Sequence, residues 1–590
     1  MNILGLSAFY HESSCCLLRH GELIAAASEE RFTRVKHDRR LPVEAFRFCL
    51  EAGGLRITDL DAVAYYELPQ RKLSRQLWSG RRHGPADDGG WLDPRRPERA
   101  IRERLGFEGR ILSFPHHLSH AASAYYFSGF PEAAVLTVDG VGEWATMTYG
   151  AGRGSTLEPF ETVDFPHSLG LLYSTLTAYL GFRVNDGEYK VMGLAPYGEP
   201  RYLDQIFQLV AVGEGGQIRL NLKHFDFIDG ESMFTPSLCD LFGQAPRRAG
   251  APITRFHQDV ARSLQLALEE ILLEKVTYLH SETGLRDLCM AGGVALNCVA
   301  NGRIRREGPF ERLFVQPAAG DAGGCLGAAA LAHCELSGTR PAMETQRHTA
   351  FGPRASADGI AGLLDATGLA AEDFRQRRRD LLTATAQRLA SGDIVGWFQG
   401  AMEHGPRALG NRSILADPRQ PDARDRLNRA IKKREDFRPF APSVLAARAA
   451  EHFDLDRASP FMLETCQVTS PLDLPAITHV DGSARPQTVD PATHPRYAAL
   501  LEAFDQLTGC PVLLNTSFNL AGEPIVCTPI DALFTATLAG LDALVLEDFL
   551  IDASALPACW GKLFPSWDRA ADDPFQPGRA TLSDTLYTFV

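Results

Sequence analysis

The sequence predicts a mixed α/β protein built from two domains. The chain opens with two short apolar segments, 3–8 and 23–27, on either side of a turn at 20–22, a pattern typical of strands. Two later segments, around 288–300 and 313–332, each lead from an apolar strand through glycines into a helix. At 590 residues the chain is too long for one ordinary hydrophobic core.

Periodicity predicts the remaining elements of the first domain. We expect a helix from about Leu118, a strand at 134–138 and a long helix at 255–282, where apolar residues recur at helical spacing. Residues 70–105 are rich in Arg, Gly, Pro and Asp and have little apolar periodicity, so they predict an inserted loop or mobile cover. No internal repeat is apparent in the sequence.

A domain boundary is predicted where the periodicity disappears. Residues 336–360 gain Pro, Gly and Thr, which is typical of a linker. We therefore predict a first domain over 1–350, a linker over 351–365 and a second domain over 366–590. The elements expected in the second domain are a strand at 393–398, a charged helix at 423–433, and a strand at 511–514 that enters a polar turn at 515–519.

Composition excludes several classes of function. Sixty Lys and Arg against 73 Asp and Glu give a net charge of -13, which disfavours a nucleic-acid partner. No apolar run approaches the roughly 18 to 20 residues that span a bilayer, and the N-terminus lacks a signal-peptide pattern. The 12 cysteines include no CxxC pair, which predicts reduced thiols. We expect a cytoplasmic protein with no membrane partner.

Two histidines and two aspartates form a candidate metal site. His116 and His120 lie four residues apart, so on a helix both imidazoles project from one face and can share a metal. The alternative, given equal weight on spacing alone, is two hydrogen-bonded histidines at a helix start. A zinc protease helix would need a glutamate between them, and 117–119 contains none.

Asp139 and Asp321 each follow an apolar strand and adjoin a glycine. An isolated Asp-Gly pair is more often just a turn. However, the carboxyl ends of strands in α/β folds are where ligands usually bind. Two His and two Asp would suit iron, manganese or zinc.

Two glycine turns, at 291–297 and 320–327, lie between a strand and a helix. Glycine at such a place lets a phosphate approach the backbone N–H groups that open the helix. Neither turn matches the dinucleotide fingerprint or the Walker loop, so each alone is weak evidence.

A basic segment stands out in the acidic chain. Residues 407–438 contain ten Lys or Arg and five acids, a net charge of +5. A solvated helix face is the usual explanation of such a run and accounts for about half of it. Arg407 and Arg412 lie in one turn and Arg438 begins another, and arginine binds phosphate oxygens bidentately. Arg485 and the turn at 515–519 add similar donors, so the segment suits a small phosphate-bearing ligand.

Taken together, these segments resemble the carbamoyltransferases of the nodulation and antibiotic-tailoring type. That family joins an actin-like (ASKHA, Kae1-like) domain to a YrdC-like α/β domain. The resemblance covers nearly the whole chain, except that 70–105 and 200–255 match nothing. The matching blocks are 9–14, 29–37, 116–121, 187–195, 291–297, 405–413, 438–443 and 515–519.

The resemblance implies two half-reactions. The YrdC-like domain would form carbamoyl-adenylate from carbamoyl phosphate and ATP, and the Kae1-like domain would transfer the carbamoyl group to a hydroxyl of a small specialised metabolite. Fe²⁺ or another divalent metal, together with Mg²⁺, would assist. The catalytic residues would be His11 as the general base, Lys36 near phosphate, and Arg407, Lys432 and Arg438 around carbamoyl phosphate.

The resemblance also assigns ligand contacts. The metal ligands would be His116, His120, Asp139 and Asp321. The residues that bind nucleotide or carbamoyl phosphate would be Glu188, Lys190, Gly292, Gly293, Asn297, Gly320, Arg412, Arg485, Ser517 and Asn519. The partner would be a small-molecule hydroxyl acceptor, and a homodimer is compatible with the resemblance.

Other functions stay open at this point. An N-carbamoyltransferase or a tRNA threonylcarbamoyl-type enzyme would use related domains, although the charge of -13 argues against tRNA. A nucleotide-switched regulatory protein with an actin fold would need no carbamoyl phosphate, and it would leave the paired arginine turns without a purpose.

Overall fold

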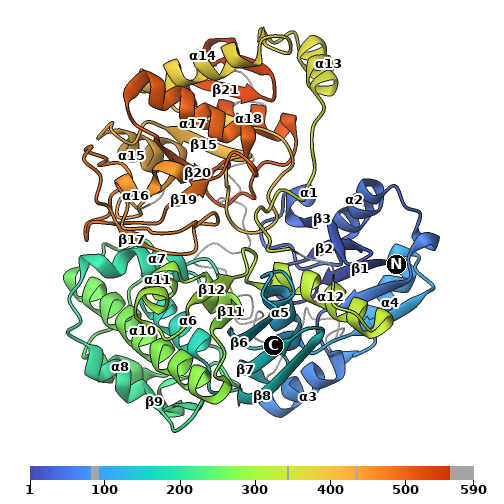
Figure 1. Cartoon of the computed structure of the whole chain (residues 1–590). Helices are drawn as coiled ribbons and strands as arrows, with labels where there is room; N and C mark the ends of the chain where they lie inside the picture. The colour runs from blue at the N-terminus through green and yellow to red at the C-terminus, as the bar shows by residue number, and fades with distance from the viewer. Residues whose placement is uncertain (81–91, 342–343, 433–434, 558–590) are drawn as a thin grey trace. The chain divides into compact units, whose positions relative to one another are not determined.

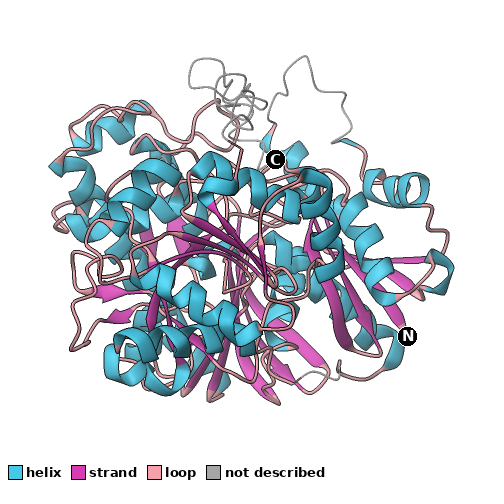
Figure 2. Ribbon diagram, turned by 90° about the horizontal axis from the view of Figure 1, so that it is seen from above, coloured by secondary structure: helices cyan, strands magenta, loops and turns pink. Residues whose placement is uncertain are grey.

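The computed structural model describes residues 1–80, 92–341, 344–432 and 435–557. They form two compact units. The first unit contains residues 1–29 and those described within 37–346, and the second contains 30–36 and those described from 347 onward. Both units consist of sheets covered by helices, so the predicted mixed α/β class is confirmed (Figures 1 and 2).

The first unit contains two five-stranded sheets. The strands of one sheet are β1 (Asn2–Ser7), β2 (Ser14–Arg19), β3 (Glu22–Ser28), β4 (Ala62–Tyr65) and β5 (Arg110–Ser113). The strands of the other are β6 (Glu132–Val138), β7 (Ala145–Arg153), β8 (Thr156–Asp164), β11 (Asp287–Ala291) and β12 (Arg312–Val315).

The two sheets share one topology. Their strand orders are β3-β2-β1-β4-β5 and β8-β7-β6-β11-β12. In each, three strands pair antiparallel through hairpins, and two later strands add parallel beside the first. This duplicated arrangement confirms the predicted actin-like fold of the first unit. The duplication is not apparent in the sequence, because it lies in the strand order rather than in repeated residues.

Two helices rich in small residues pack in the middle of this unit, α5 (His116–Tyr125) and α12 (Gly324–Ser337) (Figure 1). A Cβ atom added to Gly5 of β1 would lie 1.9 Å from the carbonyl oxygen of Cys325. One added to Gly327 would lie 1.7 Å from the carbonyl oxygen of Ser119. Only glycine allows backbones to approach this closely. The start of α12 is therefore held against α5.

We expect Gly327→Ala to destabilise the protein by about 1–3 kcal/mol, since the new methyl group overlaps a backbone carbonyl that cannot move freely. It should also reduce metal binding by α5, because the two helices must separate. The thermal unfolding midpoint and the bound metal report these effects. Gly362→Ala is the matched control, because no atom lies within 4 Å of the added carbon. Equal melting of both variants would contradict the close-packing argument.

The remaining helices cover the sheets. In the first unit they are α2 (Val43–Gly53), α3 (Pro69–Ser79), α4 (Arg96–Ala100), α6 (Leu169–Tyr179), α7 (Glu188–Leu194), α8 (Leu203–Leu209), α9 (Pro236–Phe242), α10 (Arg255–Thr283) and α11 (Cys298–Glu307). A short hairpin of β9 (Val210–Val212) and β10 (Ile218–Leu220) follows α8.

The prediction of a loop at 70–105 is wrong for most of the residues described in this segment. Helix α3 begins at Pro69, α4 begins at Arg96, and a helical turn continues to Leu105; residues 81–91 lie outside the described part of the chain. The helix was missed because its buried face is polar. Lys72 and Arg75 are buried there, and Lys72 pairs with Glu67 at 3.0 Å.

The second unit has one eight-stranded mixed sheet in the order β13-β22-β21-β14-β15-β20-β16-β19. These strands are β13 (Glu372–Asp373), β14 (Val395–Phe398), β15 (Arg412–Ala416), β16 (Ala441–Leu445), β19 (Gln487–Val489), β20 (Val512–Ser517), β21 (Ala543–Leu546) and β22 (Phe549–Asp552). A two-stranded ribbon joins β17 (Cys466–Gln467) to β18 (Ser483–Ala484).

Its helices are α1 (Glu30–Thr33), α13 (Ala357–Thr367), α14 (Arg378–Ala390), α15 (Ala423–Arg426), α16 (Ala449–His452), α17 (Pro495–Thr508) and α18 (Pro529–Ala539). Helix α13 begins within the segment predicted to be a linker and ends two residues beyond it. It is capped by Ser356, whose side chain accepts from the N–H of Gly359, and it buries Ile360 and Leu364 one turn apart. The strand at 393–398 and the charged helix at 423–433 are confirmed in their described parts.

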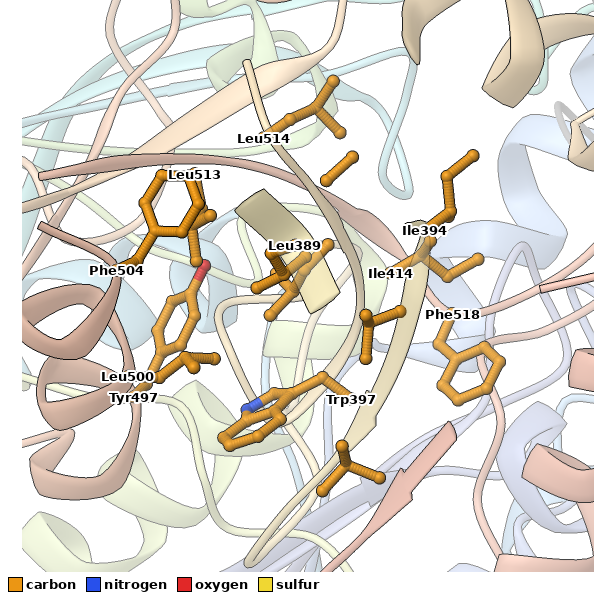
Figure 3. Close-up of a cluster of buried hydrophobic side chains, with 14 of the residues drawn as sticks. Leu389, Ile394, Trp397, Ile414, Tyr497, Leu500, Phe504, Leu513, Leu514 and Phe518 are labelled. Carbon is orange, nitrogen blue, oxygen red and sulfur yellow. The ribbon is translucent and has the colours of Figure 1, made fainter. Parts of the chain in front are cut away.

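A large apolar core supports the second unit (Figure 3). Trp397 of β14 is fully buried, and its indole N–H donates to the carbonyl of Gly410 at 2.9 Å. This bond attaches the loop before β15 to the core. The core therefore holds in place the turn that carries the basic residues predicted to bind phosphate.

Candidate functional site

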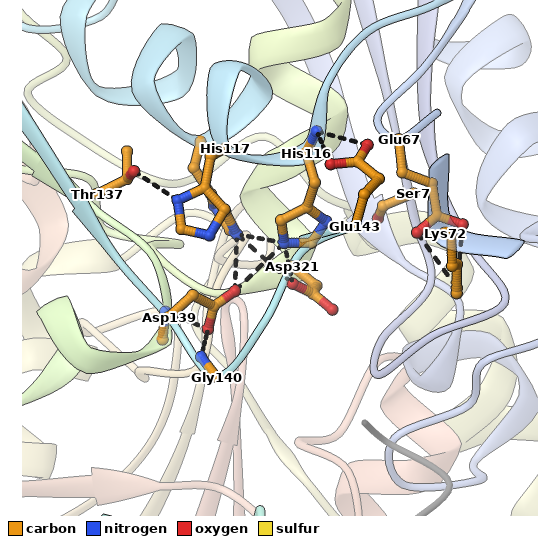
Figure 4. Close-up of polar contacts among 12 residues, drawn as sticks. Ser7, Glu67, Lys72, His116, His117, Thr137, Asp139, Gly140, Glu143 and Asp321 are labelled. Carbon is orange, nitrogen blue, oxygen red and sulfur yellow. Dashed lines mark hydrogen bonds and ion pairs between the residues drawn. The ribbon is translucent and has the colours of Figure 1, made fainter. Parts of the chain in front are cut away.

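Four side chains converge in the first unit, as the sequence predicts. His116 and His120 lie on one face of α5, and their Nε2 atoms are 3.0 Å apart. Oδ2 of Asp139 is 3.2 Å from both nitrogens. Oδ1 of Asp321 is 3.4 Å from Nε2 of His116 and 3.6 Å from that of His120. Figure 4 shows His116, Asp139 and Asp321 directed toward one point.

This donor set fits a metal ion. All four ligand atoms lie within 4.8 Å of one another, and the histidines are buried. Two imidazole nitrogens and two carboxylate oxygens are the ligands preferred by borderline divalent metals such as iron, manganese and zinc. Two ring nitrogens directed at each other across 3.0 Å need a shared cation or proton between them and the carboxylates. The structure therefore contains a candidate metal site.

The fold explains why the four side chains meet. Asp139 follows β6 directly, and Asp321 lies in the turn between β12 and α12. Strands β6, β11 and β12 are parallel neighbours, so their carboxyl ends share one edge of the sheet. The close packing of α5 on α12 brings the two histidines to that edge.

Surrounding groups orient the ligands. Oδ1 of Asp139 accepts hydrogen bonds from the N–H groups of Gly140 at 2.8 Å and Gly293 at 3.0 Å, which leaves Oδ2 for the cluster. Glu143 accepts the N–H of His116 at 3.0 Å and so caps α5 where the first histidine stands. Such outer contacts commonly set the affinity of a metal site. Sequence reasoning missed Glu143, because its partner lies 27 residues away.

Electrostatics also favour a cation. Burial alone raises the pKa of Asp139, but hydrogen bonds from His116 and His120 hold that pKa well below its usual value. Burial lowers the pKa of His120, and its bonds to Asp139 and Asp321 overcome this and raise the pKa to about 9. The proton on His120 occupies the place of a cation, so a metal must displace it. Metal affinity should consequently rise with pH up to about that pKa.

The loop after β1 lies beside the cluster. The ring of Tyr10 packs edge-on to His116, with centroids 6.2 Å apart, and Tyr66 is 5.1 Å from the same ring. The next residue, His11, packs edge-on to His37 at 5.5 Å. Nδ1 of His37 lies 3.3 Å from Oε1 of Glu12. The structure thus places the predicted base His11 in a polar group with Glu12 and His37.

The predicted ligand residues of the first unit also serve its local structure. Gly292 has φ of 92°, and a Cβ there would lie 2.3 Å from the carbonyl oxygen of Val138. Asn297 caps α11 by accepting the N–H of Ala300 at 3.0 Å. Glu188 accepts from Ser174 at 2.7 Å and from the N–H of Asn185. Their roles as ligands stay predictions.

Lys190 and Gly320 complete this set. The ammonium of Lys190 lies 5.9 Å from the centre of the Phe182 ring. Gly320 precedes Asp321, and a Cβ added there would come no closer than 4.0 Å to Glu12 or Leu296. Gly320 therefore has open space beside the predicted transfer site, in contrast to Gly292.

In the second unit, three predicted residues meet at the end of β20. Nζ of Lys432 donates to the carbonyls of Ser517 at 2.6 Å and Asn519 at 3.0 Å, and to Oδ1 of Asn519 at 2.8 Å. Oγ of Ser517 donates to the same Oδ1 at 2.6 Å. The polar turn begins later than predicted, since β20 continues through Ser517 and pairs with β15.

Arg412 is held differently from the arginines around it. Its guanidinium is fully buried and donates to four carbonyls, those of Pro353, Gln399, Gly400 and Asn411. Burial lowers its pKa to about 10. All the hydrogen bonds that the guanidinium donates fix backbone, so Arg412 holds the loops around it. Its predicted contact with a ligand stays a prediction.

The other predicted phosphate ligands lie in loops of this unit. Arg407 is partly exposed in the turn before β15. Nη1 of Arg438 lies 3.9 Å from Glu435, and Arg485 lies between β18 and β19. Lys36 ends the 30–36 segment, which belongs to this unit rather than to the unit of His11.

Glu403 is a further residue that sequence reasoning missed. Its buried Oε1 accepts the N–H groups of Leu409 at 2.7 Å and Asn411 at 2.9 Å. It thereby shapes the turn that carries Arg407. The only signal in the sequence is its place two residues before Gly405-Pro406.

No helix in the described part of the chain is long and apolar enough to cross a membrane.

Fold and site together define an enzyme with an actin-like unit, a candidate metal centre and a second α/β unit with a basic site. The family model for the carbamoyltransferase N-terminus matches residues 2–78 and 99–330, and that for the carbamoyltransferase C-terminus matches 386–553. The chain belongs to the carbamoyltransferase family.

Several curated proteins are similar over most of their length. Nodulation protein NolNO of Sinorhizobium fredii is 41% identical, over 94% of this chain and 81% of its own. The 3'-hydroxymethylcephem-O-carbamoyltransferase of Amycolatopsis lactamdurans is 37% identical, over 78% of this chain and 87% of its own. Among solved structures, HypF of T. kodakarensis matches 57% of this chain and 48% of its own, at 16% identity and a TM-score of 0.31.

Proposed function

We propose that this carbamoyltransferase forms carbamoyl-adenylate from carbamoyl phosphate and ATP, and then transfers the carbamoyl group to a hydroxyl of a small specialised metabolite. The observation that carries the proposal is a polar site in each unit of a chain that matches both family models. When carbamoyl phosphate and ATP give the adenylate, pyrophosphate and phosphate both leave and one water is consumed. The similarity to an O-carbamoyltransferase supports a hydroxyl as the acceptor.

The first unit would carry out the transfer. His116, His120, Asp139 and Asp321 would hold Fe²⁺ or another divalent metal, which would supply positive charge beside the adenylate phosphate. Gly293 and Gly320 would let the nucleotide approach the backbone. His11 would accept the proton of the acceptor hydroxyl. Once that oxygen is deprotonated, it attacks the carbamoyl carbon and AMP leaves.

The second unit would form the adenylate. Lys432, Arg407, Arg438 and Arg485 would neutralise phosphate oxygens, and Mg²⁺ would accompany ATP. Lys432 already donates to oxygens of Ser517 and Asn519, so it would exchange some of these bonds for a phosphate. Ser517 would then offer its hydroxyl to the same phosphate.

We expect Lys432→Ala and Arg407→Ala each to lower the rate of pyrophosphate release that depends on carbamoyl phosphate by about 10²-fold or more. The reason is that phosphate charge is left uncompensated. Arg429→Ala is the matched control, since Arg429 belongs to the same basic run but is exposed and faces Asp425 at 3.5 Å. Wild-type pyrophosphate release in Lys432→Ala or Arg407→Ala would remove that residue from the site.

The proposal is tested by mixing the protein with ATP and carbamoyl phosphate and detecting carbamoyl-adenylate by mass spectrometry. A panel of sugar and other alcohol acceptors then reports the transfer, and fragmentation of the product distinguishes oxygen from nitrogen carbamoylation. A nucleotide-switched regulatory protein would form no adenylate. A tRNA-modifying enzyme would label tRNA instead of the small alcohols. The proposal also includes a cytoplasmic location and a homodimer. Light scattering would test the homodimer.

A further inference from the structure

A short segment of the N-terminal sequence belongs to the second unit. Residues 30–36, which contain α1, follow the edge strand β3 of the first sheet but cluster with the chain beyond 347. Arg31 is buried, and its Nη2 donates to the carbonyl of Gly405 at 3.0 Å. Arg34 donates from Nη2 to the carbonyl of Pro524 at 2.8 Å and from Nη1 to that of Ile525 at 2.6 Å.

These carbonyls belong to the two loops that carry the predicted phosphate ligands. Gly405 lies two residues before Arg407, in the turn shaped by Glu403. Pro524 and Ile525 lie in the later part of the loop that follows Ser517 and precedes α18. The segment 30–36 thus contacts both loops: Arg31 bonds to the first loop and Arg34 bonds to the second.

A small apolar cluster lies between the two arginine contacts. Phe32 packs against Met402, Ala408, Ile525 and Cys527, which come from both loops. Since α1 is only four residues long, its own hydrogen bonds cannot hold it in place. The position of α1 therefore depends on its contacts with the two loops. The same contacts fix the distance between the two loops.

The second loop is attached at both ends. Lys432 holds its beginning through Ser517 and Asn519, and Nδ2 of Asn519 donates to the carbonyl of Glu523 at 2.7 Å. Arg34 holds its end and lies 3.7 Å from Asp531 at the start of α18. A displacement of Arg34 would consequently move the residues that accept hydrogen bonds from Lys432.

We propose that Arg31 and Arg34 are positioning residues for the adenylate-forming site, and that they set the distance between the loop of Arg407 and the loop of Ser517. This inference rests on the proposed function of the second unit. Neither arginine needs to contact the substrate. Each instead acts through a backbone carbonyl of a loop whose side chains do.

Chain connectivity ties this segment to the first unit at both of its ends. The segment is bonded at one end to Glu29, which accepts the N–H groups of Glu44 and Ala45, and at the other to His37, which contacts Glu12. Both anchors belong to the first unit. A protein that starts near residue 350 would therefore lack part of its adenylate-forming site.

The test uses the full chain and the variants Arg31→Lys, Arg34→Lys and Arg34→Met. Lysine keeps the charge but cannot donate to two carbonyls in the fixed geometry of a guanidinium. We expect Arg34→Lys to raise the KM for carbamoyl phosphate in pyrophosphate release by roughly tenfold to a hundredfold, as for one lost charge-assisted hydrogen bond. The value of kcat at saturation should fall much less, and Arg34→Met should be the most affected.

Arg426→Lys is the matched control, because Arg426 also combines a backbone carbonyl, that of Gly392 at 2.9 Å, with an aspartate, Asp542. It should retain the wild-type KM and the same thermal unfolding midpoint. If wild type releases pyrophosphate and the Arg31 and Arg34 variants keep its KM, the positioning role is refuted. If wild type shows no release that depends on carbamoyl phosphate, the proposed function itself fails. A fall in kcat alone with a lowered unfolding midpoint would indicate a merely structural role and would also refute the inference.

Discussion

His116→Ala and His120→Ala should each lower the affinity for the bound metal by more than ~100-fold and slow carbamoyl transfer correspondingly. Each change removes one of four ligand groups, whereas the loss of an outer contact alone typically costs ten- to a hundredfold. The partly buried carboxylate of Asp139 and the buried carboxylate of Asp321 would then face fewer positive partners, which weakens the site further. Elemental analysis of the purified variants measures the metal, and adenylate consumption measures the transfer.

His117→Gln is the matched control for both variants. His117 lies on the same helix and is equally buried, but its Nδ1 is hydrogen bonded to Oγ1 of Thr137 at 2.7 Å and the ring turns away from the cluster (Figure 4). This variant should keep its metal. Adenylate formation in the second unit should also persist in all three variants. Unchanged metal content in both alanine variants would contradict the ligand assignment.

Local patterns were sufficient to predict the candidate metal site. The four-residue spacing of His116 and His120 places them on one helix face whatever surrounds the helix. Asp139 and Asp321 were found because each follows an apolar strand, and parallel strands end at one edge of a sheet. These inferences depend only on short-range geometry, and the structure brings the four side chains together.

Features that depend on long-range pairing could not be predicted. Strand β2 was missed, although it pairs with both β1 and β3, because the turn at 20–22 was placed between those two strands. The duplicated sheet order depends on which distant strands pair, and no residue pattern records that. The membership of 30–36 in the second unit rests on contacts with Gly405 and Ile525, which are nearly 400 and 500 residues away.

Sequence motifs also do not distinguish a ligand contact from a structural one. Arg407 and Arg412 stand in the same turn, and both were assigned to phosphate. The structure buries Arg412 completely among backbone carbonyls, while Arg407 stays partly exposed. The difference follows from the extent of β15: Arg412 opens this strand, whose five residues are all buried, whereas Arg407 stands in the turn before it.

His11→Asn should leave adenylate formation intact and slow the transfer step by about 10²- to 10⁴-fold, the usual cost of losing a general base. His11 follows β1 and belongs to the unit that holds the metal cluster, and its neighbour Tyr10 packs on His116. Imidazole can accept a proton near neutral pH, and asparagine keeps the polarity without the basicity. Carbamoyl-adenylate should therefore accumulate in this variant.

Rapid-quench measurement of both half-reactions decides whether His11 is the base. His37→Asn is the matched variant, because His37 packs against His11 and bonds to Glu12, so it should orient the base without replacing it. Its transfer rate should fall by less than that of His11→Asn. The competing explanation is that His11 only stabilises the turn at 9–14, in which case the transfer rate would stay unchanged. Equal losses of adenylate formation and transfer would instead mean a folding defect or a single shared site, and would contradict the assignment of the two reactions to two units.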